Sequence, residues 1–164
     1  MAEFSPEEIL KVLEARAVRY VVIGGFAGII HGSPNGTSDV DITPEDGRDN
    51  LRRLSDALDE LGANIRTVGE PAGVPFPHDG PSLGVVRLWN LTTKFGDLDI
   101  SFEPSGTRGY QDLAARALRV RLPHVETTVA ALSDVIRSKE AAGRLKDQLT
   151  LPTLRRILEE GNPT

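Results

Sequence analysis

The clearest pattern of apolar and polar positions lies in the stretch from Val21 to Ile42, which reads VVIGGFAGIIHGSPNGTSDVDI. The apolar run at 19–23 predicts a buried β-strand, and the double glycine that follows it predicts a tight turn. Residues 26–30 are again apolar and predict a short helix that ends near Gly32. Acidic and apolar residues alternate in 38–43, which predicts a second strand with one buried face.

The rest of the chain continues as helical and strand-like segments. Leu51, Leu54, Leu58 and Leu61 recur at helical spacing, and Gly62 is expected to end that helix. The segment 69–84 is rich in proline and glycine and predicts a long loop. The remaining predicted elements are a helix from Pro6, strands at 64–68, 85–93, 97–102 and 118–122, and helices at 110–117, 133–142 and from Pro152 to about Glu160.

Length and composition set limits on the class of protein. The chain has 164 residues, which predicts one domain large enough to bury a hydrophobic core. It has no cysteine, and this excludes disulfides and thiolate chemistry. The acidic start MAEFSPEE argues against a signal peptide, and the longest apolar run, 20–30, is shorter than the ~20 residues that span a bilayer. We therefore expect a soluble cytoplasmic protein with no membrane partner.

Charge is distributed unevenly along the chain, whose net charge is −5. Residues 1–104 carry 9 Lys and Arg against 17 Asp and Glu, whereas residues 105–164 carry 10 against 7. An acidic part can hold metal ions and a basic part can face phosphates, although chance clustering of solvated charge is the simpler interpretation. The overall acidic charge argues against tight nonspecific binding of nucleic acid.

Two pairs of acids alternate with apolar residues on separate predicted strands. In a strand, Asp39 and Asp41 point to the same side and lie ~6–7 Å apart. Asp97 and Asp99 repeat the pattern in Gly96-Asp97-Leu98-Asp99-Ile100. If the strands are neighbours, three or four carboxylates meet at one edge of the sheet and repel one another unless cations neutralise them. Two divalent ions about 3.5–4 Å apart would neutralise them and support phosphoryl-type transfer.

Other interpretations of these residues stay open at this point. Asp97 or Asp99 can instead cap a turn or form an ion pair with Arg87 or Lys94. The Gly24-Gly25 turn lets the backbone approach a phosphate closely, but a double glycine after a strand is in most proteins only a turn.

Taken together, the order GG-F-A-x-x-x-H-G-x(4)-T-x-D-x-D and a late G-x-L-D resembles the nucleotidyltransferase fold that DNA polymerase beta shares with related enzymes. Residues 138–147 resemble the S-K-x-x-A-x-R-x-K-D signature of the compact bacterial branch around the AbiEii/AbiGii-type toxins. The resemblance covers about residues 20–155. It implies a minimal α+β nucleotidyltransferase fold with a mixed β-sheet flanked by helices. The expected organisation is a single domain over 1–164, with a core at about 18–125 and a C-terminal helical part at about 126–162.

The resemblance also implies roles for individual residues. Asp39 and Asp41 would ligate the divalent ions, and Asp99 would be a third metal ligand or the general base. The residues expected to hold the nucleotide are Gly24 and Gly25 at the triphosphate, together with Lys139, Arg144, Lys146 and Asp147. Asp147 is expected to orient a cation of this group.

The implied activity is transfer of a nucleotidyl group from an Mg²⁺- or Mn²⁺-bound NTP, ATP included, to an acceptor with release of pyrophosphate. A tRNA end, another RNA, a protein side chain or a small molecule would be the acceptor, and a toxin would have a cognate antitoxin or partner protein. Many relatives have Gly-Ser where this chain has Gly24-Gly25. This difference supports an alternative, a catalytically weak or inactive nucleotide- or partner-binding module of the same fold. A third hypothesis is a structural domain whose acids are solvated.

Overall fold

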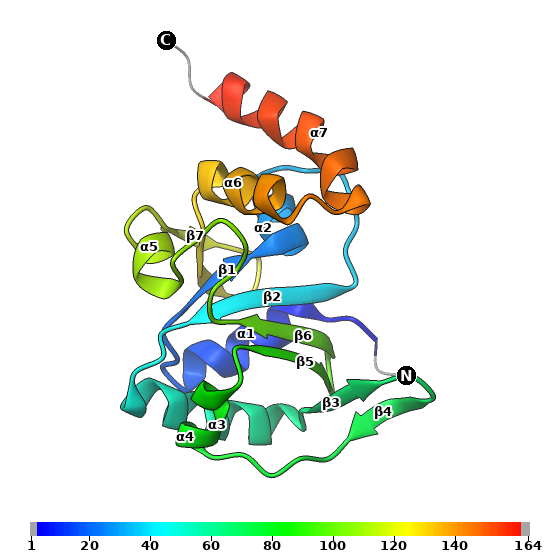
Figure 1. Ribbon diagram of the computed structural model, residues 1–164, viewed down its shortest axis with the longest axis vertical. Helices are drawn as coiled ribbons and strands as arrows, with labels where there is room; N and C mark the ends of the chain where they lie inside the picture. Colours follow the sequence, from blue (N-terminus) through cyan, green and yellow to red (C-terminus); the bar gives the residue numbers. More distant parts are fainter. Residues whose placement is uncertain (1–2, 162–164) are drawn as a thin grey trace.

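The computed structural model describes residues 3–161 and has an α+β architecture built on one eight-stranded sheet (Figure 1). The strands are β1 (Tyr20–Ile23), β2 (Asp39–Pro44), β3 (Asn64–Thr67), β4 (Glu70–Val74), β5 (Leu88–Thr93), β6 (Gly96–Ser101), β7 (Leu118–Arg121) and β8 (Glu126–Val129). The helices are α1 (Pro6–Ala15), α2 (Gly24–Ile30), α3 (Arg48–Leu61), α4 (Gly80–Val85), α5 (Tyr110–Ala114), α6 (Leu132–Ala142) and α7 (Leu145–Gly161).

The sheet is mixed, and its order is β4-β3-β5-β6-β2-β1-β8-β7. The pairs β2–β6 and β1–β8 are parallel, whereas the other neighbouring pairs are antiparallel. In the β2–β6 pair, Asp39 lies opposite Asp97 and Asp41 lies opposite Asp99. The two acidic segments of the sequence are therefore neighbours in register at the centre of the sheet.

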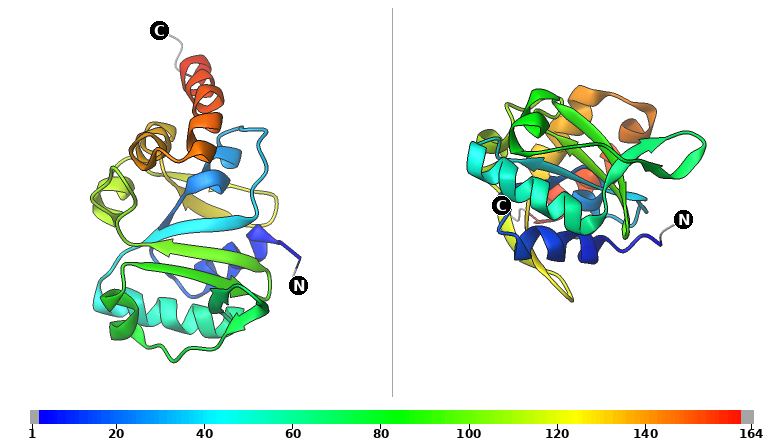
Figure 2. Two further views of the ribbon diagram at one scale, coloured as in Figure 1. Left: turned by 45° about the vertical axis from the view of Figure 1, so that its right-hand side comes forward. Right: turned by 90° about the horizontal axis from the view of Figure 1, so that it is seen from below.

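Apolar residues of the central strands bury one face of the sheet. Val40, Ile42, Leu98 and Ile100 are completely buried, as alternation along β2 and β6 requires. Helices α1 and α3 lie on the opposite side of the sheet from α6 (Figure 2), and the leucine stripe of α3 is buried as predicted. Because successive side chains alternate, packing of the apolar residues directs the acids of β2 and β6 to the other face.

The C-terminal part is helical. Helix α6 contacts α2, which follows β1 directly, and α7 contacts α6. Among residues 3–161, no helix is long and apolar enough to cross a membrane.

Two helix ends predicted from glycine are confirmed. Gly62 ends α3 with φ 63°, and Gly143 ends α6 with φ 64°. Both angles lie in the left-handed region that a side chain disfavours, which is why glycine marks these ends in the sequence.

The predicted loop at 69–84 is wrong, because this segment contains β4 and most of α4. A turn at Gly69, with φ 92°, lets β4 fold back onto β3. The Asp79 carboxylate accepts a hydrogen bond from the Ser82 amide and the Ser82 hydroxyl accepts one from the Asp79 amide, a capping box that starts α4. Leu83 of α4 is completely buried. The next strand consequently begins at Leu88 rather than at Val85.

The last helix also begins earlier than predicted, at Leu145, and Pro152 lies inside it. A proline costs one backbone hydrogen bond within a helix, but Leu151 and Leu154 are buried on either side of it. Burial of these side chains holds the helix through the proline. Strand β8 was not predicted, since the short polar run Glu126-Thr127-Thr128 shows little apolar alternation.

Candidate active site

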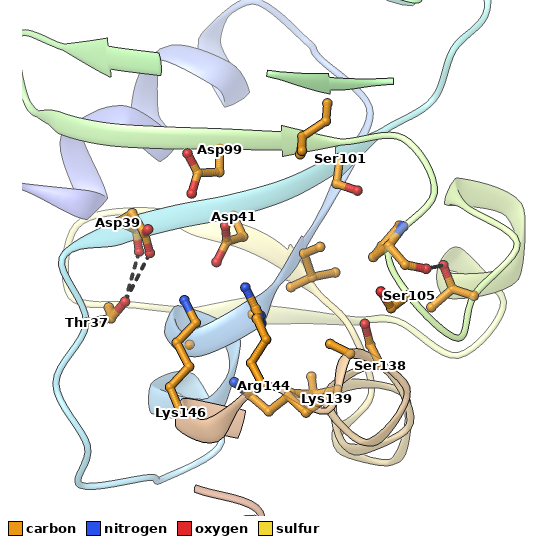
Figure 3. Close-up of a pocket in the computed structure, with 18 of the residues that line it drawn as sticks. Thr37, Asp39, Asp41, Asp99, Ser101, Ser105, Ser138, Lys139, Arg144 and Lys146 are labelled. Atoms are coloured by element: carbon orange, nitrogen blue, oxygen red, sulfur yellow. Dashed lines mark hydrogen bonds between the residues drawn. The ribbon is translucent and has the colours of Figure 1, made fainter. Parts of the chain in front are cut away.

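Three carboxylates meet on the open face of the central strands. Asp39 and Asp41 project from β2 and Asp99 projects from β6, and one oxygen of each lies within 4.8 Å of the others. The in-register parallel pairing of β2 and β6 brings them together. Asp39 also accepts a hydrogen bond from the Thr37 hydroxyl at 3.2 Å. The predicted convergence of acids from two distant segments is present in the structure (Figure 3).

Neighbouring cations offset only part of the negative charge of this cluster. Burial, followed by the charges of Asp39 and Asp99, raises the pKa of Asp41 to about 7. Burial and Asp39 likewise raise the pKa of Asp99 to about 6, although Arg66 opposes the shift. Each extra negative charge therefore costs free energy in this place. A divalent cation with oxygen ligands fits such a donor set.

Gly24 is required by the position of Asp41. Gly24 has φ 71°, and a Cβ built on it would collide with Asp41 Oδ2. A Cβ on Gly25 would lie 3.1 Å from the hydroxyl oxygen of Thr37. The double glycine begins α2 directly after β1 and does not form the predicted separate turn. Gly24 gives the Asp41 carboxylate room, and both glycines line the pocket beside it. Whether they also contact a triphosphate stays a prediction.

Arg66 of β3 is a member of the site that the sequence did not indicate. Its guanidinium donates to Asp99 Oδ1 at 2.6 Å and lies 3.0 Å from Asp97 Oδ2. Within residues 3–161, Asp97 and Asp99 pair with Arg66 and not with Arg87 or Lys94, and Arg87 pairs instead with Asp46 and Glu103. Arg66 reaches the site across β5, which lies between β3 and β6 in the sheet. A single arginine on a short polar strand carries no signal that could have assigned it.

A basic wall faces the carboxylates across the pocket. Asp147 is completely buried, and its carboxylate binds Arg144 Nε at 2.7 Å and Lys139 Nζ at 3.4 Å. Burial raises its pKa, but the hydrogen bonds and charges of Arg144 and Lys139 outweigh this and hold the pKa below its usual range. Lys146 points its amino group toward Asp39 and Asp41 (Figure 3). Asp147 is thus a support beneath the basic wall and is not itself a lining residue.

Between the two walls is a pocket of about 750 Å³. The predicted residues that line it are Gly24, Gly25, Asp39, Asp41, Asp99, Lys139, Arg144 and Lys146. Sequence reasoning missed the hydroxyl-bearing members of the lining, which are Thr37, Ser101, Ser105, Thr107, Ser138 and Thr150. One face of α6 lines the pocket and consists of residues 134, 135, 138, 139 and 142. Their helical spacing from Lys139 is a signal in the sequence that could have identified the other four.

The sequence matches no protein-family model and no curated protein. Several solved structures are similar in fold. The lincosamide antibiotic adenylyltransferase LnuA, in a lincomycin-bound structure, superposes with a TM-score of 0.62 at 14% identity, over 94% of this chain and 99% of that one. ANT(2″)-Ia, in complex with adenylyl-2″-tobramycin, gives 0.59 at 12% identity, over 93% and 86%. A nucleotidyltransferase candidate from Thermotoga maritima gives 0.54 at 17% identity, over 97% of each chain.

These similarities establish that the chain has a nucleotidyltransferase fold, as its motifs predicted. The mixed sheet with flanking and C-terminal helices is likewise confirmed. The assignment to the branch of the AbiEii/AbiGii-type toxins stays a prediction.

Proposed function

We propose that this protein transfers a nucleotidyl group from a metal-bound NTP to a hydroxyl of a small-molecule acceptor and releases pyrophosphate. The observation that carries the proposal is the convergence of Asp39, Asp41 and Asp99 within 4.8 Å, opposite a basic wall. The acids suit divalent cations and the bases suit phosphates, so the pocket has the two charges that a metal-bound triphosphate presents.

Asp39, Asp41 and Asp99 would hold the metal. The fit is supported by three oxygen donors on two neighbouring strands and by the raised pKa values of Asp41 and Asp99, which come first from burial and then from the neighbouring carboxylates. Mg²⁺ or Mn²⁺, as one or two ions, would neutralise the α-phosphate and hold the attacking and leaving oxygens. All three carboxylates are carried by strands rather than loops, which favours a fixed geometry.

Lys139, Arg144 and Lys146 would bind the triphosphate. Lys139 has a side chain only 12% exposed, and its ammonium retains donors beyond the one that faces Asp147. Arg144 is oriented by two of its side-chain nitrogens on the same carboxylate. Thr37 adds a hydroxyl beside Gly25, 3.1 Å from where a Cβ on that glycine would lie.

The chain's residues can then direct the transfer. The acceptor oxygen forms a bond to the α-phosphorus while the bond from that phosphorus to the bridging oxygen of the β-phosphate breaks. Pyrophosphate leaves with the electron pair. The proton of the acceptor hydroxyl passes to Asp99 Oδ2, the oxygen that Arg66 does not bind.

A small molecule is the acceptor class that the pocket supports best. The volume of the pocket, about 750 Å³, lies within the range of about 300–1,000 Å³ typical of small-ligand sites. LnuA and ANT(2″)-Ia are named for adenylyl transfer or bound to an adenylylated antibiotic, which makes ATP the first nucleotide to test. RNA ends and protein side chains are the competing acceptors. An antitoxin partner would be expected only if the acceptor is RNA or protein, as for a toxin.

The test supplies Mg²⁺ and each NTP labelled at the α-phosphate to three acceptor pools: hydroxyl-bearing small molecules, total RNA and lysate protein. We expect label in the small-molecule pool, and a loss of about a thousandfold or more in Asp41→Asn. Asp49→Asn is the matched control, since its side chain is 79% exposed on α3. Label in RNA or protein alone would contradict the acceptor class. NTP binding without transfer to any pool would instead favour the inactive binding module, which the absence of a hydroxyl at Gly25 supports.

A further inference from the structure

Arg66 reaches the carboxylate cluster from two strands away. Strand β3 pairs with β5, and β5 pairs with β6, so Arg66 spans about 10 Å of sheet to reach the acids. It contacts Asp97 and Asp99 together, at 3.0 and 2.6 Å, with its side chain 32% exposed. A long side chain held at both ends of its guanidinium is a fixed part of the site rather than a freely solvated arginine.

The four acids of β2 and β6 differ in their partners. The ion pairs found within residues 3–161 include one for Asp97 and one for Asp99, both with Arg66, and none for Asp39 or Asp41. Arg66 therefore forms direct ion pairs on the β6 side of the cluster, whereas on the β2 side Lys146 faces Asp39 and Asp41 without an ion pair. The exposed fraction of the Asp99 side chain is 17%, so this charge acts where water screens it weakly.

We propose that Arg66 is an internal counter-cation that competes with a divalent metal ion for Asp99. This inference rests on the proposed function only in taking the cluster as the metal site. While Arg66 binds Asp99 Oδ1, an ion at the cluster receives the full charge of Asp39 and Asp41 but only part of the charge of Asp99. Arg66 thus lowers the affinity of the nucleotide-free protein for metal. It also reduces the repulsion among the carboxylates, so that the protein stays folded when no metal is bound.

The sign of the effect separates this role from simple positioning. If Arg66 only held Asp99 in place, its removal would loosen one ligand and weaken metal binding. If Arg66 competes with the ion, its removal restores a full negative charge and strengthens metal binding. Its removal also leaves the metal-free protein less stable, and added metal restores that stability.

The experiment is a Mn²⁺ titration by calorimetry and electron paramagnetic resonance, without nucleotide. We expect Arg66→Gln to bind Mn²⁺ at least about tenfold more tightly than the wild type, which corresponds to about 1.4 kcal/mol. Arg66→Lys keeps the charge and should stay within about threefold of the wild type. Arg87→Gln is the matched control: it removes the same charge from the pocket lining, where Arg87 pairs with Asp46 and Glu103, and we expect less than about a twofold change.

Equal or weaker Mn²⁺ binding by Arg66→Gln would overturn the proposal, and so would equal tightening in Arg87→Gln. If Arg66→Gln unfolds without metal, recovery of its fold on adding Mn²⁺ supports competition, and Arg66→Met provides a second uncharged variant for the titration. Two other results would contradict the proposed function instead. One is that neither the wild type nor any Arg66 variant binds Mn²⁺. The other is that Asp41→Asn binds Mn²⁺ as tightly as the wild type.

Discussion

Asp41 and Asp147 lie on opposite sides of one pocket and have opposite surroundings. Asp147 is completely buried, yet Arg144 and Lys139 keep its pKa below the usual range. Asp41 is also largely enclosed, but its nearest charged neighbours in the cluster are carboxylates, and its pKa rises to about 7. Burial acts in the same direction on both groups, so the sign of the difference comes from the charges beside them.

The comparison separates a structural carboxylate from a candidate functional one. Asp147 has its cations within the chain, and its ion pairs fix α6 against the start of α7. The cluster of Asp39, Asp41 and Asp99 has fewer cations than acids, and a bound metal ion would supply what is missing. Such unbalanced charge lowers the stability of a free protein and is typical of functional sites.

The largest stability effect should come from Asp147. In Asp147→Asn, the largely buried Lys139 loses its charged partner, while Arg144 is 60% exposed and can turn to solvent, and we expect the free energy of unfolding to fall by about 3 kcal/mol. Urea unfolding measures this difference. Glu140→Gln is the control, because its pair with Arg155 is half exposed and should contribute less than about 0.5 kcal/mol. Wild-type stability in Asp147→Asn would show that the basic wall does not depend on this carboxylate.

Asp41→Asn should have the opposite sign. A carboxyl pKa near 7 in the folded protein, against 3.8 in a free side chain, means that the folded state binds more protons than the unfolded state between about pH 4 and 7. Wild-type stability without metal therefore falls as pH rises through this window. We expect Asp41→Asn to be more stable by about 2 kcal/mol at pH 8, because Asp39 and Asp99 share part of the charge cost, and to lose this advantage by pH 4.5.

Urea unfolding in a chelator, at both pH values, measures the Asp41→Asn effect, with Asp49→Asn as the exposed control. Saturating Mn²⁺ should reverse the order of stability, since the wild type binds the ion with three carboxylates and the variant with two. A destabilised Asp41→Asn at pH 8 would make Asp41 a structural residue and contradict its assignment to the metal site.

The parts of the fold and of the site that follow from a local sequence pattern could be predicted. The alternation Asp39-Val40-Asp41-Ile42 fixed which side chains are buried, and its repeat at Asp97–Asp99 matched the pairing of β2 with β6. Glycines with positive φ marked the ends of α3 and α6. These features depend on residues close together in the chain, which is why periodicity and turn chemistry were sufficient.

Contacts between distant segments could not be predicted in this way. Arg66 meets Asp99 across β5, a neighbour relation that only the strand order defines. Helix α7 continues through Pro152 because tertiary burial outweighs a local cost. Segment 69–84 was assigned from its proline and glycine content, although a capping box and one buried leucine were enough to form α4. The missed features are therefore those that depend on the assembled fold.

Lys139→Ala tests the basic wall from the ligand side. Loss of its ammonium should weaken NTP affinity by about tenfold, near 1.4 kcal/mol, since one charge-assisted contact to phosphate is removed. Mn²⁺ affinity in the absence of nucleotide should change by less than about threefold. Isothermal titration with a non-hydrolysable NTP analogue measures the first quantity. Lys94→Ala is the control, because Lys94 lies in the exposed turn between β5 and β6. Unchanged NTP affinity would assign Lys139 to the support of Asp147 alone.

Asp99→Asn should produce the smallest change, because Asp99 combines features of both regions. Like Asp41, it lies in a cluster of acids, so neutralising it relieves repulsion with Asp39. Like Asp147, it has a cation, and Arg66 would be left with Asp97 as its one charged partner. These effects oppose each other, and we expect metal-free stability at pH 8 to change by less than about 1 kcal/mol. A gain in stability as large as that of Asp41→Asn would mean that Arg66 stabilises the Asp99 carboxylate only weakly. A loss of stability as large as that of Asp147→Asn would make the Arg66–Asp99 pair a structural ion pair.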